Sequence, residues 1–280
     1  MRFYITLVIC VIHLLPFQSM AQSNLPNLPY SNGDDFVVIA HRGASAYAPE
    51  NTHSAFQLAI EMQSEMIEFD VLLSKDGIPV IIHDENLERT TGVVGLVGEF
   101  TLAELKELKT GAWFSEEFSE EPFPTLEEVL KYTKGKIAVN IEIKYESVTD
   151  NVQGGIVDKA LELVKNADME QEVIFSSFDY RVMEHLNVLA PTVPKALLYE
   201  PDQSGDLSPS QLVEKYNVDA FNFSYKQLTD EWIAELNANE IPFFIYTVND
   251  EDLMEKIIKS GAKGIFSDKP DVLKQVVENL

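Results

Sequence analysis

Two carboxylates on one predicted strand are the first residues whose spacing suggests chemistry. Residues 66–73 have the composition of a buried strand, and Glu68 and Asp70 lie two positions apart within it. Side chains at positions i and i+2 of a strand point to the same face, so the two carboxylates project together. Two like charges inside a closed sheet need a cation to offset them. On an exposed edge strand the same pair would face solvent, so the spacing alone indicates a metal site only weakly.

A third carboxylate comes from the predicted strand 136–144. Its alternation directs Asn140, Glu142 and Lys144 to one side, away from the apolar positions between them. Three hard carboxylate ligands, without cysteine or an obvious histidine ligand, favour Ca²⁺ or Mg²⁺ over zinc. The alternative is a buried ion pair between Glu142 and Lys144, which the spacing also allows.

Two histidines stand where predicted β-rich runs end. His41 ends the run 36–41, with Arg42 directly after it, and His83 ends the short apolar run 79–83. Histidine can exchange protons near neutral pH, and the planar fork of an arginine can bind phosphate. A single histidine at a strand end is more often structural. Two histidines that converge beside a metal site favour acid–base catalysis.

The rest of the chain alternates short β-rich runs with amphipathic segments. The strands are predicted at 36–41, 66–73, 136–144, 173–178, 195–199, 219–223, 242–247 and 263–267. The helices between them are predicted at 51–62, 125–134, 153–166, 180–189, 208–216, 229–239 and 251–260. Such alternation implies a parallel sheet, and eight strands suggest closure into a TIM-type (β/α)8 barrel with its active site at the carboxyl ends of the strands.

One further apolar run, 79–83, follows the second strand too closely for a parallel crossover. The turn at Asp76-Gly77 must therefore bring it back as an antiparallel hairpin arm, with His83 near Asp70. The segment 84–124 then has no barrel strand of its own. It is expected to form a small insertion after the second strand, with a short helix at residues 101–109.

Three parts are expected along the chain. Residues 1–21 combine Arg2, an apolar run and a small-residue end, which is typical of a secretory signal peptide, although an uncleaved anchor is the alternative. The apolar run is shorter than a membrane-spanning helix requires. Residues 22–35 are rich in Asn, Ser and Pro and are typical of a linker, and 36–280 form the barrel domain. We therefore expect an exported protein, periplasmic or secreted, without stable membrane insertion after cleavage.

Composition limits the partners. The 280 residues include 21 Lys and Arg against 46 Asp and Glu, which gives a formal net charge of −25. Binding to nucleic acid or to an anionic membrane depends on cationic side chains, so neither is expected. Any phosphate site must be locally positive within this acidic chain.

Taken in order, the motifs resemble those of the glycerophosphodiester phosphodiesterases. They are His41-Arg42-Gly43-Ala44, Pro49-Glu50-Asn51-Thr52, Glu68-x-Asp70, Lys75-Asp76-Gly77, His83-Asp84, Thr90-Thr91-Gly92, Pro124-Thr125-Leu126-Glu127-Glu128, Asn140-Ile141-Glu142-Ile143-Lys144 and Thr247-Val248-Asn249. Each motif is weak by itself, but their ordered co-occurrence is specific. Tyr246 is a mild departure, because many relatives have Trp at this position.

The resemblance implies a TIM-like barrel that hydrolyses small glycerophosphodiesters to sn-glycerol 3-phosphate and an alcohol with the help of a divalent metal. By analogy, the metal ligands are Glu68, Asp70 and Glu142, the general acid/base pair is His41 and His83, and the phosphate contacts are Arg42 and Lys144. Glu50, Asn51 and Asp84 belong to the same pattern and are expected to support these residues.

Two other functions fit parts of the sequence. The same site could act on a lysophospholipid or another lipid phosphodiester, with Trp113 and Phe114 of the insertion against an acyl chain. The absence of a basic amphipathic segment favours the soluble substrate. A non-catalytic binding relative is the second alternative, although such a protein would be expected to have lost a histidine or a metal carboxylate.

Overall fold

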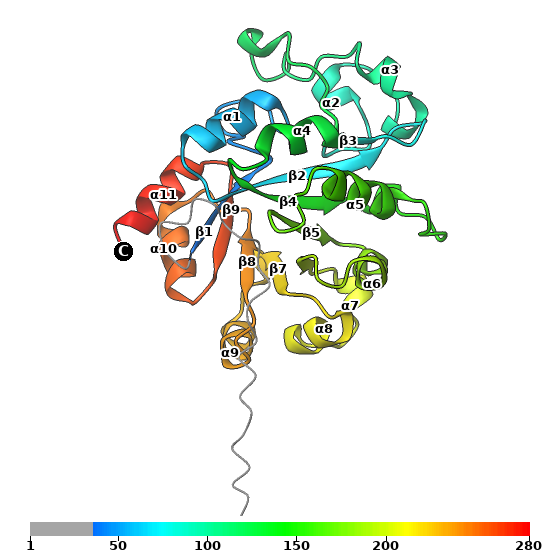
Figure 1. The fold of residues 1–280 in the computed structure, drawn as a ribbon. Helices are drawn as coiled ribbons and strands as arrows, with labels where there is room; N and C mark the ends of the chain where they lie inside the picture. Colours follow the sequence, from blue (N-terminus) through cyan, green and yellow to red (C-terminus); the bar gives the residue numbers. More distant parts are fainter. Residues whose placement is uncertain (1–35) are drawn as a thin grey trace, which may run out of the picture.

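The computed structural model describes residues 36–280, so the predicted signal peptide (1–21) and linker (22–35) lie outside the described residues. Eight parallel strands form the barrel: β1 (Val37–His41), β2 (Met66–Leu73), β4 (Ala138–Ile143), β5 (Val173–Ser177), β6 (Lys195–Leu198), β7 (Ala220–Ser224), β8 (Phe243–Tyr246) and β9 (Gly264–Ser267). The order β1-β9-β8-β7-β6-β5-β4-β2 is closed by pairing of β1 with β2 (Figure 1). The predicted (β/α)8 barrel is therefore confirmed.

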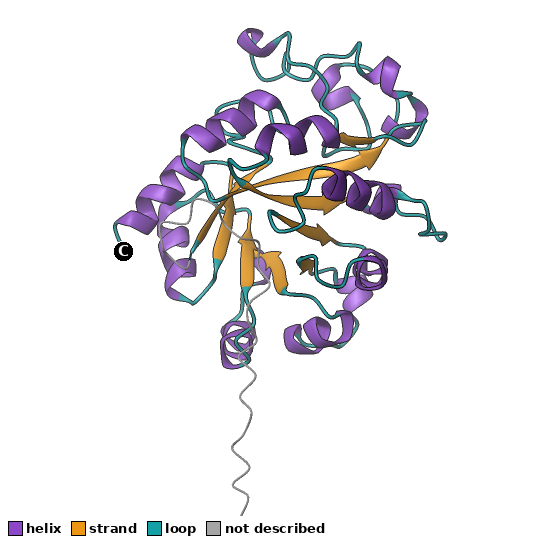
Figure 2. Cartoon of the chain, in the orientation of Figure 1, coloured by secondary structure: helices purple, strands orange, loops and turns teal. Residues whose placement is uncertain are grey.

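Helices cover the outside of the barrel (Figure 2). They are α1 (His53–Glu61), α4 (Leu126–Thr133), α5 (Ile156–Asn166), α6 (Tyr180–Leu189), α8 (Pro209–Tyr216), α9 (Asp230–Ala238), α10 (Glu251–Lys259) and α11 (Pro270–Glu278), with a single turn, α7 (Pro201–Ser204), before α8. Helix α11 was not predicted. Its signal is present in the sequence, because Pro270 occupies the first turn and apolar residues recur at 273, 276 and 277.

Alternation along β4 separates the two sides of the barrel wall. Val139, Ile141 and Ile143 belong to the large apolar core between strands and helices. Nine other residues form the apolar floor inside the barrel: Val37, Ile39, Met66, Ala138, Ile174, Ala196, Ala220, Phe244 and Phe266. The inward positions nearer the carboxyl ends of β2 and β4, Glu68 and Glu142 among them, are polar. Apolar packing thus supports a polar site at one end of the barrel.

The loop from β1 to α1 shows why the helix begins later than predicted. Asn51 has a left-handed backbone with φ 59°, which a helix cannot include. Thr52 is the N-cap instead, and its side chain accepts a hydrogen bond from the amide of Ala55. The predicted start at residue 51 is therefore wrong by two positions. The later start leaves Asn51 in the loop, where its side chain can reach Asp70 on β2.

The predicted hairpin arm is present as β3 (Pro79–Ile81), antiparallel to β2. Beyond it the chain forms α2 (Glu88–Thr91), the 3-10 turns η1 (Val97–Glu99) and η2 (Glu116–Phe118), and α3 (Leu102–Leu105), and it adds no barrel strand before α4. Leu72, Val80, Ile82, Leu87, Val97, Leu105 and Phe123 give this region its own small core. The helix predicted at 101–109 is only one turn long, because the next amide bonds are of the i→i+3 type.

Candidate active site

Strand register brings the three predicted metal-binding carboxylates together. Asp70 on β2 is the direct partner of Glu142 on the parallel strand β4, and Glu68 on β2 is the partner of His41 on β1. One carboxylate oxygen from each of Glu68, Asp70 and Glu142 lies within 4.8 Å of the other two. Glu68 and Asp70 are almost fully buried, with 3% and 1% of their surface exposed.

Burial and mutual repulsion change how these carboxylates ionise. Burial raises the pKa of Glu68 well above its usual value, and the charges of Asp70 and Glu142 raise it further. Burial also raises the pKa of Glu142, to about 7, with Lys144 offsetting part of the effect. For Asp70 burial acts in the same direction, but Arg42 and Lys144 outweigh it and hold the pKa below its ordinary value.

These shifts show that the residues suit a divalent cation. Arg42 and Lys144 are sufficient to keep Asp70 ionised. Glu68 and Glu142 remain harder to ionise, because both are buried close to other carboxylates. A cation among the three would stabilise all the ionised forms at once, and hard carboxylate oxygens are the ligands that Ca²⁺ and Mg²⁺ prefer. Glu68, Asp70 and Glu142 therefore can hold a metal of this type.

The two predicted phosphate contacts stand beside the carboxylates. Lys144 Nζ is 3.1 Å from Glu142 Oε1 and 3.5 Å from Asp70 Oδ1, so the ion pair considered as an alternative is present in the structure. Arg42 Nε is 3.6 Å from Asp70 Oδ2. The Arg42 amide, in a left-handed conformation with φ 58°, donates to Glu68 Oε2 at 3.0 Å. Metal binding and phosphate binding would thus involve the same connected group of charges.

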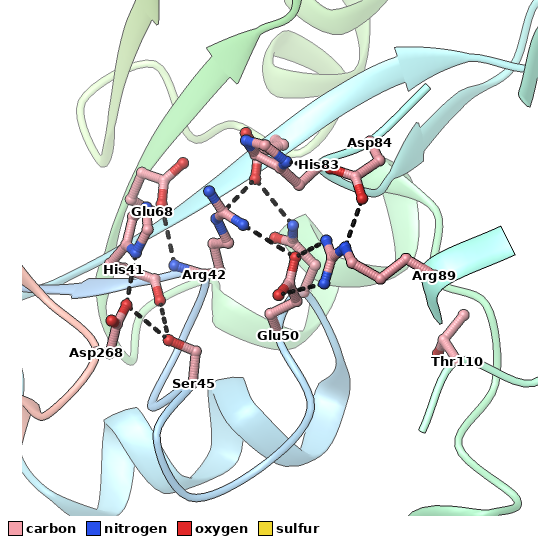
Figure 3. A network of polar contacts seen from close by, with 12 residues as sticks. His41, Arg42, Ser45, Glu50, Glu68, His83, Asp84, Arg89, Thr110 and Asp268 are labelled. Atoms are coloured by element: carbon pink, nitrogen blue, oxygen red, sulfur yellow. Dashed lines mark hydrogen bonds and ion pairs between the residues drawn. The ribbon is translucent and has the colours of Figure 1, made fainter. Parts of the chain in front are cut away.

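His41 is oriented by a carboxylate that was not among the predicted site residues. Its Nδ1 is 2.6 Å from Oδ1 of Asp268, which directly follows β9 (Figure 3). Ser45 Oγ donates to the same oxygen at 3.0 Å, and Asn249 Nδ2 donates to Oδ2 at 2.6 Å. Burial raises the pKa of Asp268, but its hydrogen bonds with His41, Asn249 and Ser45 and the charge of His41 outweigh this and lower it to about 2. The position of Asp268 at the end of the last barrel strand was an available signal.

His83 is held in a similar way by its neighbour in the sequence. Its Nδ1 is 2.6 Å from Asp84 Oδ1, and Asp84 also accepts from Arg89. Burial lowers the pKa of His83, and the nearby positive charges of Arg42 and Lys144 act in the same direction. Because a carboxylate engages Nδ1 of each histidine, Nε2 is the ring nitrogen that each has left for a substrate.

The two other predicted supporting residues each contact a charged residue of the site. Asn51 Nδ2 donates to Asp70 Oδ2 at 2.9 Å, and Arg42 Nη1 donates to Glu50 Oε1 at 3.0 Å. Hydrogen bonds to the ionised form of a carboxylate stabilise that form. Asn51 thereby helps to keep Asp70 ionised.

One pocket of about 160 Å³ joins these groups at the carboxyl end of the barrel. Its polar lining comes mainly from His41, Arg42, Glu68, His83, Glu142 and Lys144. The remaining wall is largely apolar and includes Phe178, Leu198, Tyr246 and Phe266. Phe178 and Phe266 both contact the ring of Tyr246 edge-on, at centroid distances of 6.0 and 6.1 Å. The pocket therefore offers a charged surface for an ionic group and an apolar surface for a short carbon chain of the same ligand.

Trp113 and Phe114 do not line this pocket. They pack edge-to-face against each other in the insertion, and Phe114 packs in the same way on Phe118. The residues considered for acyl-chain binding are thus engaged with one another.

The helices within residues 36–280 were also compared with the length and apolar composition that a membrane span requires, and none of them meets both requirements.

A closed α/β barrel that carries paired histidines, clustered carboxylates and two positively charged side chains at the carboxyl ends of its strands has the groups that hydrolysis of a phosphate ester requires. Residues 41–272 match the model of the glycerophosphoryl diester phosphodiesterase family. The chain belongs to this family, and it is a phosphodiesterase of the glycerophosphodiester type.

Individual relatives agree with the family match. A glycerophosphodiester phosphodiesterase of Caldanaerobacter subterraneus is 39% identical over 245 residues, which is 86% of this chain and 97% of the relative. The structure of an Oleispira antarctica phosphodiesterase in complex with the product sn-glycerol-3-phosphate has a TM-score of 0.77 at 29% identity, covering 86% of this chain and 96% of that one. The crystal structure of an Agrobacterium tumefaciens glycerophosphodiester phosphodiesterase gives a TM-score of 0.74 at 28% identity, covering 86% and 99%.

Proposed function

We propose that this protein hydrolyses soluble glycerophosphodiesters to sn-glycerol 3-phosphate and an alcohol, using His41 and His83 as the general acid and base. The observation that carries the proposal is the convergence of two carboxylate-oriented histidines, three clustered carboxylates and two cations on one pocket. The product named for the Oleispira antarctica neighbour supports sn-glycerol 3-phosphate as the product here.

Charge on the phosphoryl oxygens is the first obstacle to hydrolysis. Arg42 and Lys144 line the pocket with their positive charges and would bind those oxygens. A divalent cation held by Glu68, Asp70 and Glu142 would supply further stabilisation of the negative charge that develops in the transition state. Without that cation, three carboxylates face two positively charged side chains. The site therefore becomes positive enough for an anionic substrate only when the carboxylates are neutralised.

Proton transfer is the second requirement. One histidine takes the proton of the attacking oxygen, and the other gives a proton to the departing alkoxide. Asp268 and Asp84 accept from Nδ1 of His41 and His83, which fixes the rings and directs Nε2 to the pocket. Each carboxylate also stabilises the imidazolium form of its histidine.

The apolar wall favours a compact substrate. Phe178, Leu198, Tyr246 and Phe266 would pack on the carbon atoms of the glycerol. A pocket of about 160 Å³ suits a glycerol phosphate unit better than a long acyl chain.

The proposal is tested by glycerophosphocholine hydrolysis in purified His41→Ala and His83→Ala variants. Each substitution is expected to lower kcat by roughly 100-fold or more, the usual contribution of a general acid or base. His185→Ala is the matched control, because His185 Nε2 also meets a carboxylate, Asp158, at 2.7 Å but lies outside the pocket. Rates like those of the unmodified protein in either site variant would refute the assignment.

Export is a separate part of the proposal and rests on the leader-like sequence of residues 1–21. Expression of the full chain, followed by amino-terminal sequencing of the exported material, should give a start at Gln22. Recovery of an uncleaved chain would show that export by a cleaved signal peptide is wrong.

A further inference from the structure

We propose that Arg89, in the insertion, is a positioning residue for both His83 and Arg42. It lies on α2, and its guanidinium bridges two carboxylates (Figure 3). Nε donates to Asp84 Oδ2 at 2.5 Å, while Nη1 and Nη2 donate to the two oxygens of Glu50 at 3.0 and 2.7 Å. The Arg89 side chain thus connects the insertion to the loop after β1.

Each bridged carboxylate also contacts a residue of the proposed site. Asp84 uses its other oxygen, Oδ1, to engage His83 Nδ1 at 2.6 Å. Glu50 Oε1 accepts from Arg42 Nη1 at 3.0 Å as well as from Arg89. Arg89 is therefore linked to His83 through Asp84. Through Glu50 it is linked to Arg42.

The charge of Arg89 has a consequence for Arg42. Without Arg89, Glu50 would pair with Arg42 alone and would neutralise the guanidinium that should face the phosphate. With Arg89 present, Glu50 is shared between two guanidinium groups and offsets less of the charge of Arg42. The planar fork of an arginine can satisfy both Glu50 oxygens and still reach Asp84, a geometry that the point charge of a lysine does not reproduce.

The insertion holds Arg89 from its outer side. The guanidinium carbon is 5.5 Å from the centre of the Trp113 ring, within the range of a cation–π contact. Trp113 is itself anchored, because Nε1 donates to the carbonyl of Thr110 at 2.9 Å. This contact gives the insertion a role in the site although Trp113 does not line the pocket.

A contribution of Arg89 to stability has to be separated from its positioning role. Its side chain is 41% exposed, but that of Glu50 is only 13% exposed, and a bidentate pair of this kind can stabilise the fold. The variants are therefore compared as folded protein well below their melting temperatures, where a loss of kcat reports positioning.

The inference rests on the roles proposed above for His83 and Arg42, and steady-state kinetics of the full chain test it. Arg89→Gln is expected to lower kcat by roughly 10- to 100-fold, as for other displacements of a reacting group by about 1 Å. KM should rise by a smaller factor. Arg89→Lys should recover only part of the loss, and guanidinium ion added at low millimolar concentration should partly restore Arg89→Ala, whereas the same concentration of sodium chloride should not.

A double substitution shows whether Arg89 acts through Asp84. If it does, Asp84→Asn combined with Arg89→Gln costs less than the product of the two separate losses. Lys274→Gln is the control: it removes an ion pair with Glu65, at 2.5 Å, next to the amino-terminal ends of the strands and away from the pocket. This control should keep the kcat of the unmodified protein.

The possible failures can be told apart. If Arg89→Gln lowers only the melting temperature and leaves kcat and KM unchanged, the positioning role is overturned. If His83→Ala and Arg42→Ala also react at the rate of the unmodified protein, the proposed function itself is wrong.

Discussion

His41 and Asp268 meet across the pairing of β1 with β9, with Nδ1 and Oδ1 2.6 Å apart. His41 ends β1 and Asp268 follows β9, so 227 positions of sequence separate two residues that pairing of the first and last barrel strands makes neighbours. Closure of the barrel therefore completes one half of the proposed acid–base pair.

Asp268→Asn should separate orientation from charge. The amide can still occupy the same space, but it cannot stabilise the imidazolium form of His41. We expect kcat to fall by roughly 100-fold or more with little change in KM, measured with glycerophosphocholine. Ser45→Ala removes only one donor to Asp268 and should cost much less. Equal effects of the two substitutions would contradict this account of His41.

Stability of the metal-free protein should depend on pH in a defined direction. The pKa of Glu142 is raised to about 7 from an ordinary 4.5, so the folded protein binds more protons than the unfolded chain between these values. Stability from this group is full below pH 4.5 and is lost as the pH rises through 7. Glu68 is shifted in the same direction.

The measurement is the melting temperature of EDTA-treated protein at about pH 5.5, 6.5 and 7.5, a series that spans the titration of Glu142. It should decrease over this series, and Glu142→Gln should make the decrease smaller. Added Ca²⁺ should stabilise the protein most at the highest pH, because protons and metal compete for the same carboxylates. Because the lowered pKa of His83 acts in the opposite direction, the test is the difference between the two proteins. A pH dependence that Glu142→Gln leaves unchanged would be inconsistent with the raised pKa of Glu142.

Lys144→Met should reveal the role of the buried ammonium group. Burial lowers the pKa of Lys144, but Glu142 and Asp70 outweigh burial and raise it, so the group is charged throughout the working pH range. The substitution should lower kcat/KM by at least about tenfold through weaker binding of the phosphoryl oxygens. An unchanged kcat/KM in folded protein would exclude Lys144 as a phosphate contact.

Substrate choice distinguishes the soluble diester from the lipid. We expect kcat/KM for glycerophosphocholine to exceed that for lysophosphatidylcholine by at least about tenfold, because a pocket of about 160 Å³ suits a glycerol phosphate unit better than a long acyl chain. Release of sn-glycerol 3-phosphate from the first substrate and of a lysophosphatidic acid from the second provides the assay. A strong preference for the lysolipid would favour the alternative function.

The fold was predictable because its signals are local. Alternation along β2 and β4 determined which side of the wall faces inward, and the turn at Asp76-Gly77 placed β3 beside β2. The predicted metal ligands came together for the same reason, since neighbouring parallel strands set their register. The start of α1 was harder to predict, because the left-handed backbone of Asn51 delays the helix although the residue type does not require that conformation.

The remaining parts of the site depend on contacts between distant segments. Asp268 became a partner of His41 only through closure of the barrel, and Arg89 reached Glu50 only because the insertion folds over the loop after β1. Asp268 is marked as a candidate site residue by its place after the last barrel strand, but no spacing in the sequence reveals either contact. Asp268 and Arg89 therefore support the site from positions that the hydrophobic periodicity of the sequence does not indicate.

Metal dependence of the reaction tests the central claim most directly. The full chain is treated with EDTA, the chelator is removed, and formation of sn-glycerol 3-phosphate from glycerophosphocholine is followed after separate addition of Ca²⁺ and Mg²⁺. We predict that activity is lost on treatment and returns with at least one of the two ions, whereas Glu142→Gln recovers poorly at the same concentration. Full activity in the treated protein without added metal would contradict the account.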